Sequence, residues 1–261
     1  MSDFIGTKLT MNLGERSYDI ILKNGALENL YQFARLDRRV AVVTDSGVPA
    51  QYAQRVADQC REARIITVPQ GEASKSFRIL ESVLQQMLDF NMGRGDLVVA
   101  VGGGVVGDLA GFAASIYMRG IDFINCPTTT LSMIDSSIGG KTAVDLGDTK
   151  NIVGAFWQPK LVIVDPDTLA TLPRRHYING LAEAVKASLL ADPELFGIFE
   201  KGDIDGQINE IIYRSLRFKK NIVEQDETER GMRKALNFGH TIGHGIEAVK
   251  GIKGRRTVGL F

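Results

Sequence analysis

The stretch LVVAVGGGVVGD, residues 97–108, decides the fold. Its first half is an apolar, β-branched run of strand length, and its glycines lead directly into an apolar helical pattern. Gly102, Gly104 and Gly107 satisfy G-x-G-x-x-G in the strand, turn and helix order that a dinucleotide-binding loop requires. The N–H groups at the start of such a helix can bind a pyrophosphate. Glycines also let a helix pack closely on a sheet, so the motif alone leaves both interpretations open.

On both sides of this stretch, short β-rich runs alternate with amphipathic segments, which is the pattern of a parallel sheet covered by helices. Strands are predicted over 40–44, 64–68, 97–101, 123–126 and 161–164, helices over 76–90 and 105–117, and an added edge strand over 18–22. After Pro173, helical patterns take over, at 181–190, 208–223 and 240–249. We therefore predict an α/β fold, with a Rossmann-like parallel-sheet domain over residues 1–172 followed by an all-α domain over residues 173–261.

The composition indicates a globular protein without a general affinity for polyanions. With 44% hydrophobic residues, the chain of 261 residues can build a sizeable core. Its 31 Lys and Arg balance 31 Asp and Glu, so we predict no binding to nucleic acid or to membranes. The two cysteines, Cys60 and Cys126, are too few for a disulfide framework. No signal peptide or spanning segment is recognised, and we predict a cytoplasmic location.

Two loops of the α/β part carry candidate binding residues. The segment 71–75 lies between a predicted strand and a predicted helix, where Glu72 can bind ribose hydroxyls or simply begin the helix. The segment 127–142 contains a run of threonines, Asp135 and Lys141, which suit a polyol or a phosphate, although its Gly-Lys-Thr ending also fits a solvated turn. Asp135 stands where a P-loop needs its first glycine, which excludes a P-loop NTPase.

The helical part carries candidate metal ligands. His240 and His244 are four residues apart, so on a helix both imidazoles share one face, where they bind a metal ion or a substrate, or lie at the surface. Thr241 excludes the H-E-x-x-H metalloprotease motif. Glu183 and Lys186 are one turn apart, so Glu183 either joins the metal site or forms an ordinary ion pair with Lys186.

Taken together, six motifs resemble those of 3-dehydroquinate synthase, and the resemblance extends from about Tyr18 to Glu247. In chain order they are GEASK, GGGVVGD, PTTTLSMIDSSIGGKT, KNIVGAFWQPK, LAEAVK and NFGHTIGH. The resemblance implies a Rossmann-like domain that binds NAD, a helical domain that carries a zinc or cobalt ion, and a homodimer. It also implies the shikimate-pathway reaction that converts 3-deoxy-D-arabino-heptulosonate 7-phosphate to 3-dehydroquinate and phosphate.

The same resemblance implies roles for individual residues. NAD contacts are expected from Asp45, Glu72, Lys75, Gly103, Gly104, Asp108, Thr128 and Thr129. Substrate binding and catalysis are expected from Asp135, Lys141, Lys150, Asn151, Lys186, Lys219, Arg233, Asn237 and His244. Glu183 and His240 would be two metal ligands, and Arg119 would reach the phosphate in the neighbouring subunit.

The implied reaction begins when NAD transiently oxidises a substrate hydroxyl. Phosphate then leaves by elimination, and the hydride returns to the substrate. A metal ion polarises the hydroxyl oxygen, and the enclosing site orients the intramolecular aldol step that closes the ring. Lys141, Lys186 and Arg233 would hold the phosphate and carboxylate groups.

After His244 the chain departs from the family pattern, because the third metal histidine of the family has no counterpart. Its position falls near Gly254, where neighbouring arginines disfavour a divalent ion. His176 is not expected to replace it, since we predict this residue on the loop between the two domains. With the helical domain ending at Phe261, we expect apolar helix faces without partners.

Several functions therefore remain open at this point. Besides 3-dehydroquinate synthase, the alternatives are a related sugar-phosphate cyclase, a glycerol-dehydrogenase-like oxidoreductase, and an inactive NAD-binding remnant. The presence of Arg119, Arg233 and Asn237 together favours the dehydroquinate substrate.

Overall fold

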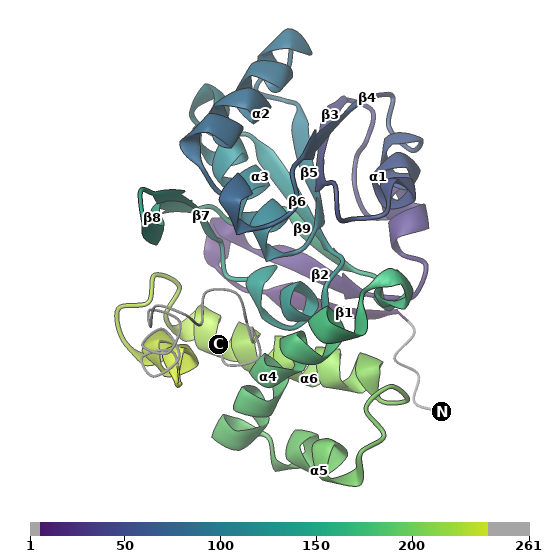
Figure 1. Ribbon diagram of the computed structural model, residues 1–261, viewed down its shortest axis with the longest axis vertical. Coiled ribbons are helices and arrows are strands. Elements are labelled where there is room, and N and C mark those ends of the chain that lie inside the picture. The colour runs from purple at the N-terminus through teal and green to yellow at the C-terminus, as the bar shows by residue number, and fades with distance from the viewer. Residues whose placement is uncertain (1–5, 240–261) are drawn as a thin grey trace.

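A seven-stranded sheet forms the centre of the protein in the computed structural model, which describes residues 6–239 (Figure 1). The strand order is β1-β2-β9-β6-β5-β3-β4, and every pairing is parallel except that of β1 with β2. The strands are β1 (Thr7–Met11), β2 (Tyr18–Leu22), β3 (Arg39–Asp45), β4 (Glu62–Val68), β5 (Leu97–Gly102), β6 (Asp122–Pro127) and β9 (Leu161–Val164). The predicted α/β fold with a parallel sheet is confirmed.

The edge position predicted for residues 18–22 is wrong. This segment forms β2, which pairs with β1 on one side and with β9 on the other. Its mostly buried YDIIL sequence fits a strand that is flanked on both sides. The edge strand on this side of the sheet, β1, escaped prediction because its sequence TKLTM is mostly only half-buried and carries a weak apolar signal.

Helices cover both faces of the sheet (Figure 1). Helix α1 (Ala50–Ala57) lies on one face, and α2 (Phe77–Asp89) and α3 (Gly104–Ile116) lie on the other. Side chains of a strand point alternately to the two faces, so Val42 packs with α1 whereas Val43 packs with α2 and α3.

A hairpin that the sequence did not predict projects beside α3. Strands β7 (Lys141–Leu146) and β8 (Thr149–Phe156) form a separate antiparallel sheet. Val144 is fully buried in the core under α3, whereas Leu146 and Ile152 are exposed. Strand β7 begins at Lys141, inside a Gly-Lys-Thr sequence that fits either a binding loop or a solvated turn, and neither interpretation predicts a strand.

The chain from Arg174 onward is helical in the part that the structure describes. The helices are α4 (Arg174–Ala191), α5 (Pro193–Lys201) and α6 (Ile208–Gln225), followed by a 3₁₀ turn over Met232–Asn237. The helices predicted at 181–190 and 208–223 are confirmed, while the one predicted at 240–249 lies outside the described residues. Helix α4 begins directly after Pro173, so the exposed His176 lies in its first turn and not on a loop as expected.

Helices α4 and α6 share a core with the sheet. Leu181 and Leu216 pack in one cluster with Ile20 of β2 and Val162 of β9. A division into two domains at Pro173 stays a prediction.

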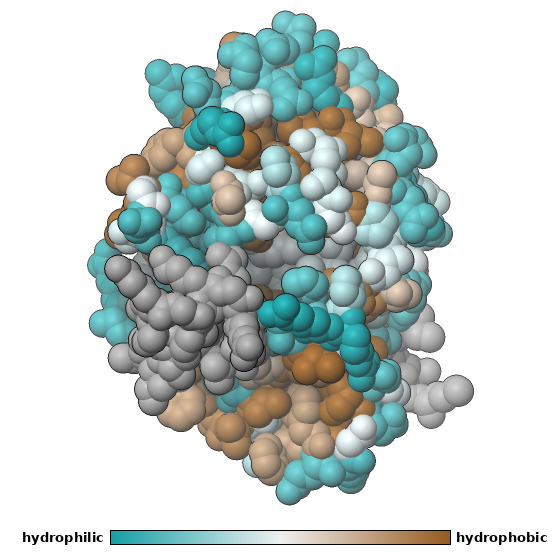
Figure 2. Space-filling model, in the orientation of Figure 1, coloured by the Kyte–Doolittle hydropathy of each residue, from teal (hydrophilic) through white to brown (hydrophobic). Residues whose placement is uncertain are grey.

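Apolar side chains are exposed over the helical part of the molecule (Figure 2). In α4, Ile178 and Leu189 are 52% and 61% exposed, and Phe238 after the 3₁₀ turn is 64% exposed. Among residues 6–239, no helix is long and apolar enough to span a lipid bilayer.

Candidate active site

The glycine loop joins β5 to α3 as predicted. Strand β5 ends at Gly102 and α3 begins at Gly104. A Cβ atom on Gly103 would lie 3.1 Å from the Thr129 side chain, and one on Gly104 would lie 3.0 Å from Ser136 Oγ. The absence of side chains therefore lets the start of α3 approach the hydroxyl-rich segment that follows β6, where its unpaired N–H groups can face an anion.

Four other predicted NAD contacts lie at the same edge of the sheet. Asp45 ends β3, Glu72 follows β4, and Thr128 and Thr129 follow β6. Thr128 N donates a 2.9 Å hydrogen bond to Gly102 O, which joins the ends of two neighbouring strands. Ligands of open α/β sheets bind at the carboxyl ends of the strands, so this edge can hold a dinucleotide.

Lys75 connects the loop after β4 to α3 and to the hairpin. Its side chain is only 4% exposed, and its Nζ lies 2.6 Å from Asp108 Oδ2 and 3.8 Å from Glu72 Oε1. It also donates a hydrogen bond to Asn151 Oδ1. Burial raises the pKa of Asp108 to about 6, against the opposing effect of Lys75. Residues that the sequence separates widely thus meet at one buried cation.

The raised pKa of Asp108 predicts a pH dependence of stability. The folded state binds this proton more tightly than an unfolded aspartate, whose pKa is about 3.9, so the contribution is fully present below about pH 4 and is lost as the pH rises through about 6. We expect Asp108→Asn to remove a decline of roughly 2 kcal/mol in the free energy of unfolding between these pH values. Urea denaturation at a series of pH values measures it, and an equal decline in wild-type and variant protein would contradict the assignment.

A second buried ion pair joins the segment after β6 to α6. Lys219 of α6 is 7% exposed, and its Nζ lies 2.9 Å from Asp135 Oδ1 and 2.7 Å from Asp135 O. Burial by itself would raise the pKa of Asp135, but Lys219, Lys186 and Arg233 outweigh it and hold this pKa below its usual range. Burial lowers the pKa of Lys219. Asp135 is therefore an ionised acceptor beside the glycine loop.

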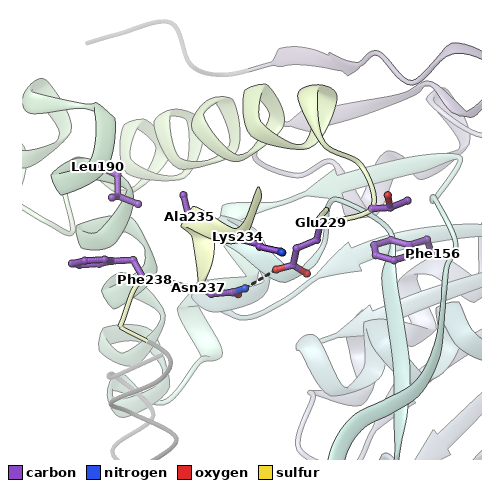
Figure 3. Close-up of a pocket in the computed structure, with 8 residues that line it drawn as sticks. Phe156, Leu190, Glu229, Lys234, Ala235, Asn237 and Phe238 are labelled. Carbon is purple, nitrogen blue, oxygen red and sulfur yellow. Dashed lines mark hydrogen bonds between the residues drawn. The ribbon is translucent and has the colours of Figure 1, made fainter. Parts of the chain in front are cut away.

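Glu229 is a site residue that the sequence reasoning missed. Its carboxylate pairs with Lys141 and accepts a 2.7 Å hydrogen bond from Asn237 Nδ2. Figure 3 shows Glu229 between Asn237 and Phe156. These contacts, above all that with Lys141, outweigh burial and keep the pKa of Glu229 below its usual range. Glu229 follows Asp226 and Glu227 in an acidic loop, and nothing in that sequence distinguishes it from its neighbours.

Two adjoining cavities surround this carboxylate. The first, of about 500 Å³, is lined by five of the predicted residues, namely Asp108, Asp135, Lys141, Asn151 and Lys219, together with Glu229 and further residues of the hairpin. The second, of about 750 Å³, adjoins it through the shared residues Phe156 and Glu229 and is also lined by Leu190, Lys234, Asn237 and Phe238 (Figure 3). The first cavity combines cationic, anionic and amide groups, as a phosphorylated polyol requires.

Other predicted residues lie outside these two cavities. Arg233 is 1% exposed, and its guanidinium donates to Glu227 O and to Gly139 O. Lys150 of β8 is exposed. Arg119 is exposed in the 3₁₀ turn after α3, with φ at 69°, and none of the side chains that the structure describes pairs with it.

The predicted metal ligand Glu183 is buried in α4 and pairs with Lys186. Lys186 Nζ also donates a 2.5 Å hydrogen bond to Leu236 O. Burial, with repulsion from Asp135, raises the pKa of Glu183. Within residues 6–239, no three His, Cys, Asp or Glu side chains gather closely enough to hold a metal ion. His240, His244 and the position near Gly254 lie outside the described residues, so Glu183 supplies one suitable carboxylate there and the rest of the ligand set stays a prediction.

Comparison with known proteins identifies a family for this chain. Residues 65–179 match the family model described as 3-dehydroquinate synthase N-terminal, and residues 180–256 match the corresponding C-terminal model. The 3-dehydroquinate synthase of Pelobacter propionicus is 42% identical over 93% of this chain and 71% of its own length. The chain belongs to the 3-dehydroquinate synthase family. The enzyme of that name from Caulobacter vibrioides is 46% identical over 92% of this chain and 69% of its own length.

Solved structures of related cyclases share the fold. A 2-deoxy-scyllo-inosose synthase complexed with carbaglucose-6-phosphate, NAD⁺ and Co²⁺ matches with a TM-score of 0.82 at 26% identity, covering 92% of this chain and 70% of that one. A 2-epi-5-epi-valiolone synthase from Streptomyces hygroscopicus subsp. jinggangensis, with NAD⁺ and Zn²⁺ bound, gives a TM-score of 0.82 at 30% identity over 95% of this chain and 73% of that one.

A more distant likeness concerns the fold alone. A probable glycerol dehydrogenase from Sinorhizobium meliloti is 15% identical with a TM-score of 0.58, covering 93% of this chain and 81% of that one. The higher identity to the 3-dehydroquinate synthases favours that family over the cyclase and dehydrogenase alternatives.

Proposed function

We propose that this chain converts 3-deoxy-D-arabino-heptulosonate 7-phosphate to 3-dehydroquinate and phosphate, as a carbon–oxygen lyase of the shikimate pathway. The observation that carries the proposal is the first cavity, where five of the predicted site residues meet beside the glycine loop. Family membership supplies the reaction, and the cavity supplies the charged and polar groups that a sugar phosphate needs.

The dinucleotide half of the site lies at the carboxyl edge of the sheet. Gly103 and Gly104 let the start of α3 lie close against Thr129 and Ser136, and the backbone N–H groups at this helix start can bind a pyrophosphate. Asp45 and Glu72 supply carboxylates that can accept hydrogen bonds from ribose hydroxyls. When bound, NAD supplies a reversible hydride acceptor, and a divalent metal supplies a Lewis acid.

The substrate half lies in the first cavity. Lys141, with its side chain 50% exposed, offers a cation for the phosphate. Asp135 and Glu229 are ionised acceptors that can receive hydrogen bonds or a proton from the substrate. Asn237 donates to Glu229 and orients it. We assign Lys150, Lys186, Arg233 and His244 to the same substrate site on the basis of the family resemblance.

Glu183 and His240 are proposed to hold the metal ion. Carboxylate and imidazole are suitable zinc ligands. Lys186 pairs with Oε2 of Glu183, and the remaining lone pairs of this carboxylate can bind a metal ion.

A homodimer completes the proposal. Arg119 lies at the far end of α3 from Asp108, about 12 Å along the helix axis. It follows Met118, so two successive residues have left-handed backbone, at φ 51° and 69°. A strained, exposed arginine suits a role at a partner surface, and we propose that it reaches the phosphate in the neighbouring subunit.

A phosphate-release assay tests the reaction. We expect purified protein with NAD and zinc or cobalt to release phosphate and form 3-dehydroquinate in equal amounts, with no net NADH. Lys141→Met should reduce this turnover by at least about a hundredfold, since it removes the cavity's exposed cation. Release of phosphate without 3-dehydroquinate would contradict the proposal, as would NAD binding without turnover, which would favour the inactive alternative. NADH formation from glycerol would favour the dehydrogenase alternative.

A further inference from the structure

Glu227 joins three segments of the chain next to the substrate cavity. Its Oε2 lies 2.7 Å from Arg16 Nη2, in the connection between β1 and β2. Its Oε1 accepts hydrogen bonds from Arg16 Nε at 3.1 Å and from Gln158 Nε2 at 2.9 Å, in the connection between β8 and β9. The loop that carries Glu227 is thereby fixed to the α/β part from two sides.

The contacts of Glu227 extend to the turn that leads into Lys141. Gln158 is 8% exposed and lies against Gly140, where a Cβ atom would stand 2.6 Å from its amide. Arg233 donates one hydrogen bond to Glu227 O and another, of 3.1 Å, to Gly139 O. The acidic loop and the turn before β7 are therefore held as one unit.

Glu229 needs such support because its backbone is strained. Its φ is 60°, a left-handed conformation that a residue with a side chain seldom adopts unless its surroundings impose it. The carboxylate of Asp226 accepts hydrogen bonds from the N–H groups of Arg230, Gly231 and Arg233, which fixes the loop on one side of Glu229. Glu227 fixes it on the other side.

The ion pair between Arg16 and Glu227 is expected to add little to the free energy of unfolding. The Arg16 side chain is 64% exposed, and an ion pair with such an exposed partner contributes little to folding. Its effect on the position of Glu229 is expected to matter more for the rate, since a displacement of about 1 Å at a reacting group can change a rate by on the order of a hundredfold.

We propose that Glu227, held by Arg16 and Gln158, is a positioning residue that sets the place of Glu229 relative to Lys141 and Asn237. This role rests on the proposed function of the first cavity. Glu227 itself lines neither of the two cavities, and its contact with the predicted substrate residue Arg233 is made by its backbone carbonyl.

Two variants, Glu227→Gln and Arg16→Met, test the role in turnover. We expect each to lower kcat about tenfold, with unchanged NAD affinity and a melting temperature within about 3 °C of wild type. Combined with Glu229→Gln, neither should slow the enzyme further, because it acts through Glu229. Asp205→Asn, which breaks the exposed pair with Arg174, is the matched control and should leave kcat unchanged. Additive losses, or wild-type kcat in both variants, would overturn the proposal.

A second measurement does not depend on turnover. Hydrogen exchange of the Arg230, Gly231 and Arg233 amides should become at least about tenfold faster in Arg16→Met than in Asp205→Asn. The fluorescence of Trp157, the single tryptophan, should shift as well because it precedes Gln158. If wild-type protein releases no phosphate, the proposed function fails, and the exchange rates alone decide whether Glu227 fixes the loop. Unchanged exchange would overturn the positioning role.

Discussion

Lys219→Met is expected to reduce turnover at least about a hundredfold, because it removes the cation that holds Asp135 in the cavity. Methionine keeps most of the buried aliphatic stem but leaves the Asp135 carboxylate without its ion-pair partner. The free energy of unfolding should fall by about 3 kcal/mol, the lower end for breaking a buried ion pair, because Asp135 stays 30% exposed. Steady-state kinetics and urea denaturation measure the two effects.

Lys220 provides the control for this variant. It neighbours Lys219 in α6 and pairs with Glu224 four residues on, away from the cavities. Lys220→Met should cost less than about 1 kcal/mol and leave kcat unchanged. If Lys219→Met behaved like Lys220→Met, the Asp135–Lys219 pair would have no part in the reaction.

Gly180→Ala is expected to destabilise the protein by about 3 kcal/mol, the upper part of the range for overpacking. A Cβ atom at this position would lie 2.3 Å from Leu131 N and 2.6 Å from Thr130 Cβ, and backbone cannot move aside as a flexible side chain would. Helix α4 would have to shift away from the segment that precedes Asp135. Since Glu183 lies one turn further along α4, it would move as well, and metal affinity should weaken.

A helical glycine without close neighbours is the matched control. Gly197 lies in α5, and a Cβ atom there would meet nothing within 4 Å. Gly197→Ala should stabilise the protein by up to about 1 kcal/mol through helix propensity. Thermal denaturation and zinc titration compare the two variants. Equal stability of both would show that the α4 contact tolerates a methyl group.

The strands of the sheet other than β1 could be predicted, because their sequences are rich in apolar, β-branched residues and most of them are buried from both sides. The LVVAVG strand is entirely buried, and its position and the helix after it are confirmed. The hairpin could not be predicted, since KTAVDL and TKNIVGAF take their place from packing on α3 and from the Lys75 contact with Asn151. Tertiary contacts of this kind leave no periodic signal in the sequence.

Some residues of the candidate site could likewise be predicted from the sequence, and others could not. The lysines and carboxylates of the first cavity belong to motifs that resemble a known family, so they could be named before the structure. Glu229 could not be named from the sequence, because its importance comes from its left-handed backbone and from its side-chain contacts. Lys141 is distant along the chain, and Asn237 reaches Glu229 only because the chain turns between them.

The core that α4 and α6 share with the sheet has a consequence for biosynthesis on the ribosome. The β2 and β9 side chains on that face, Ile20 and Val162 among them, have α4 and α6 as their cover. Strand β2 leaves the ribosome just over 200 residues before the end of α6, so its side of this apolar face is exposed to solvent through most of translation. Nascent chains of this protein should therefore bind general chaperones until residue 225 has emerged.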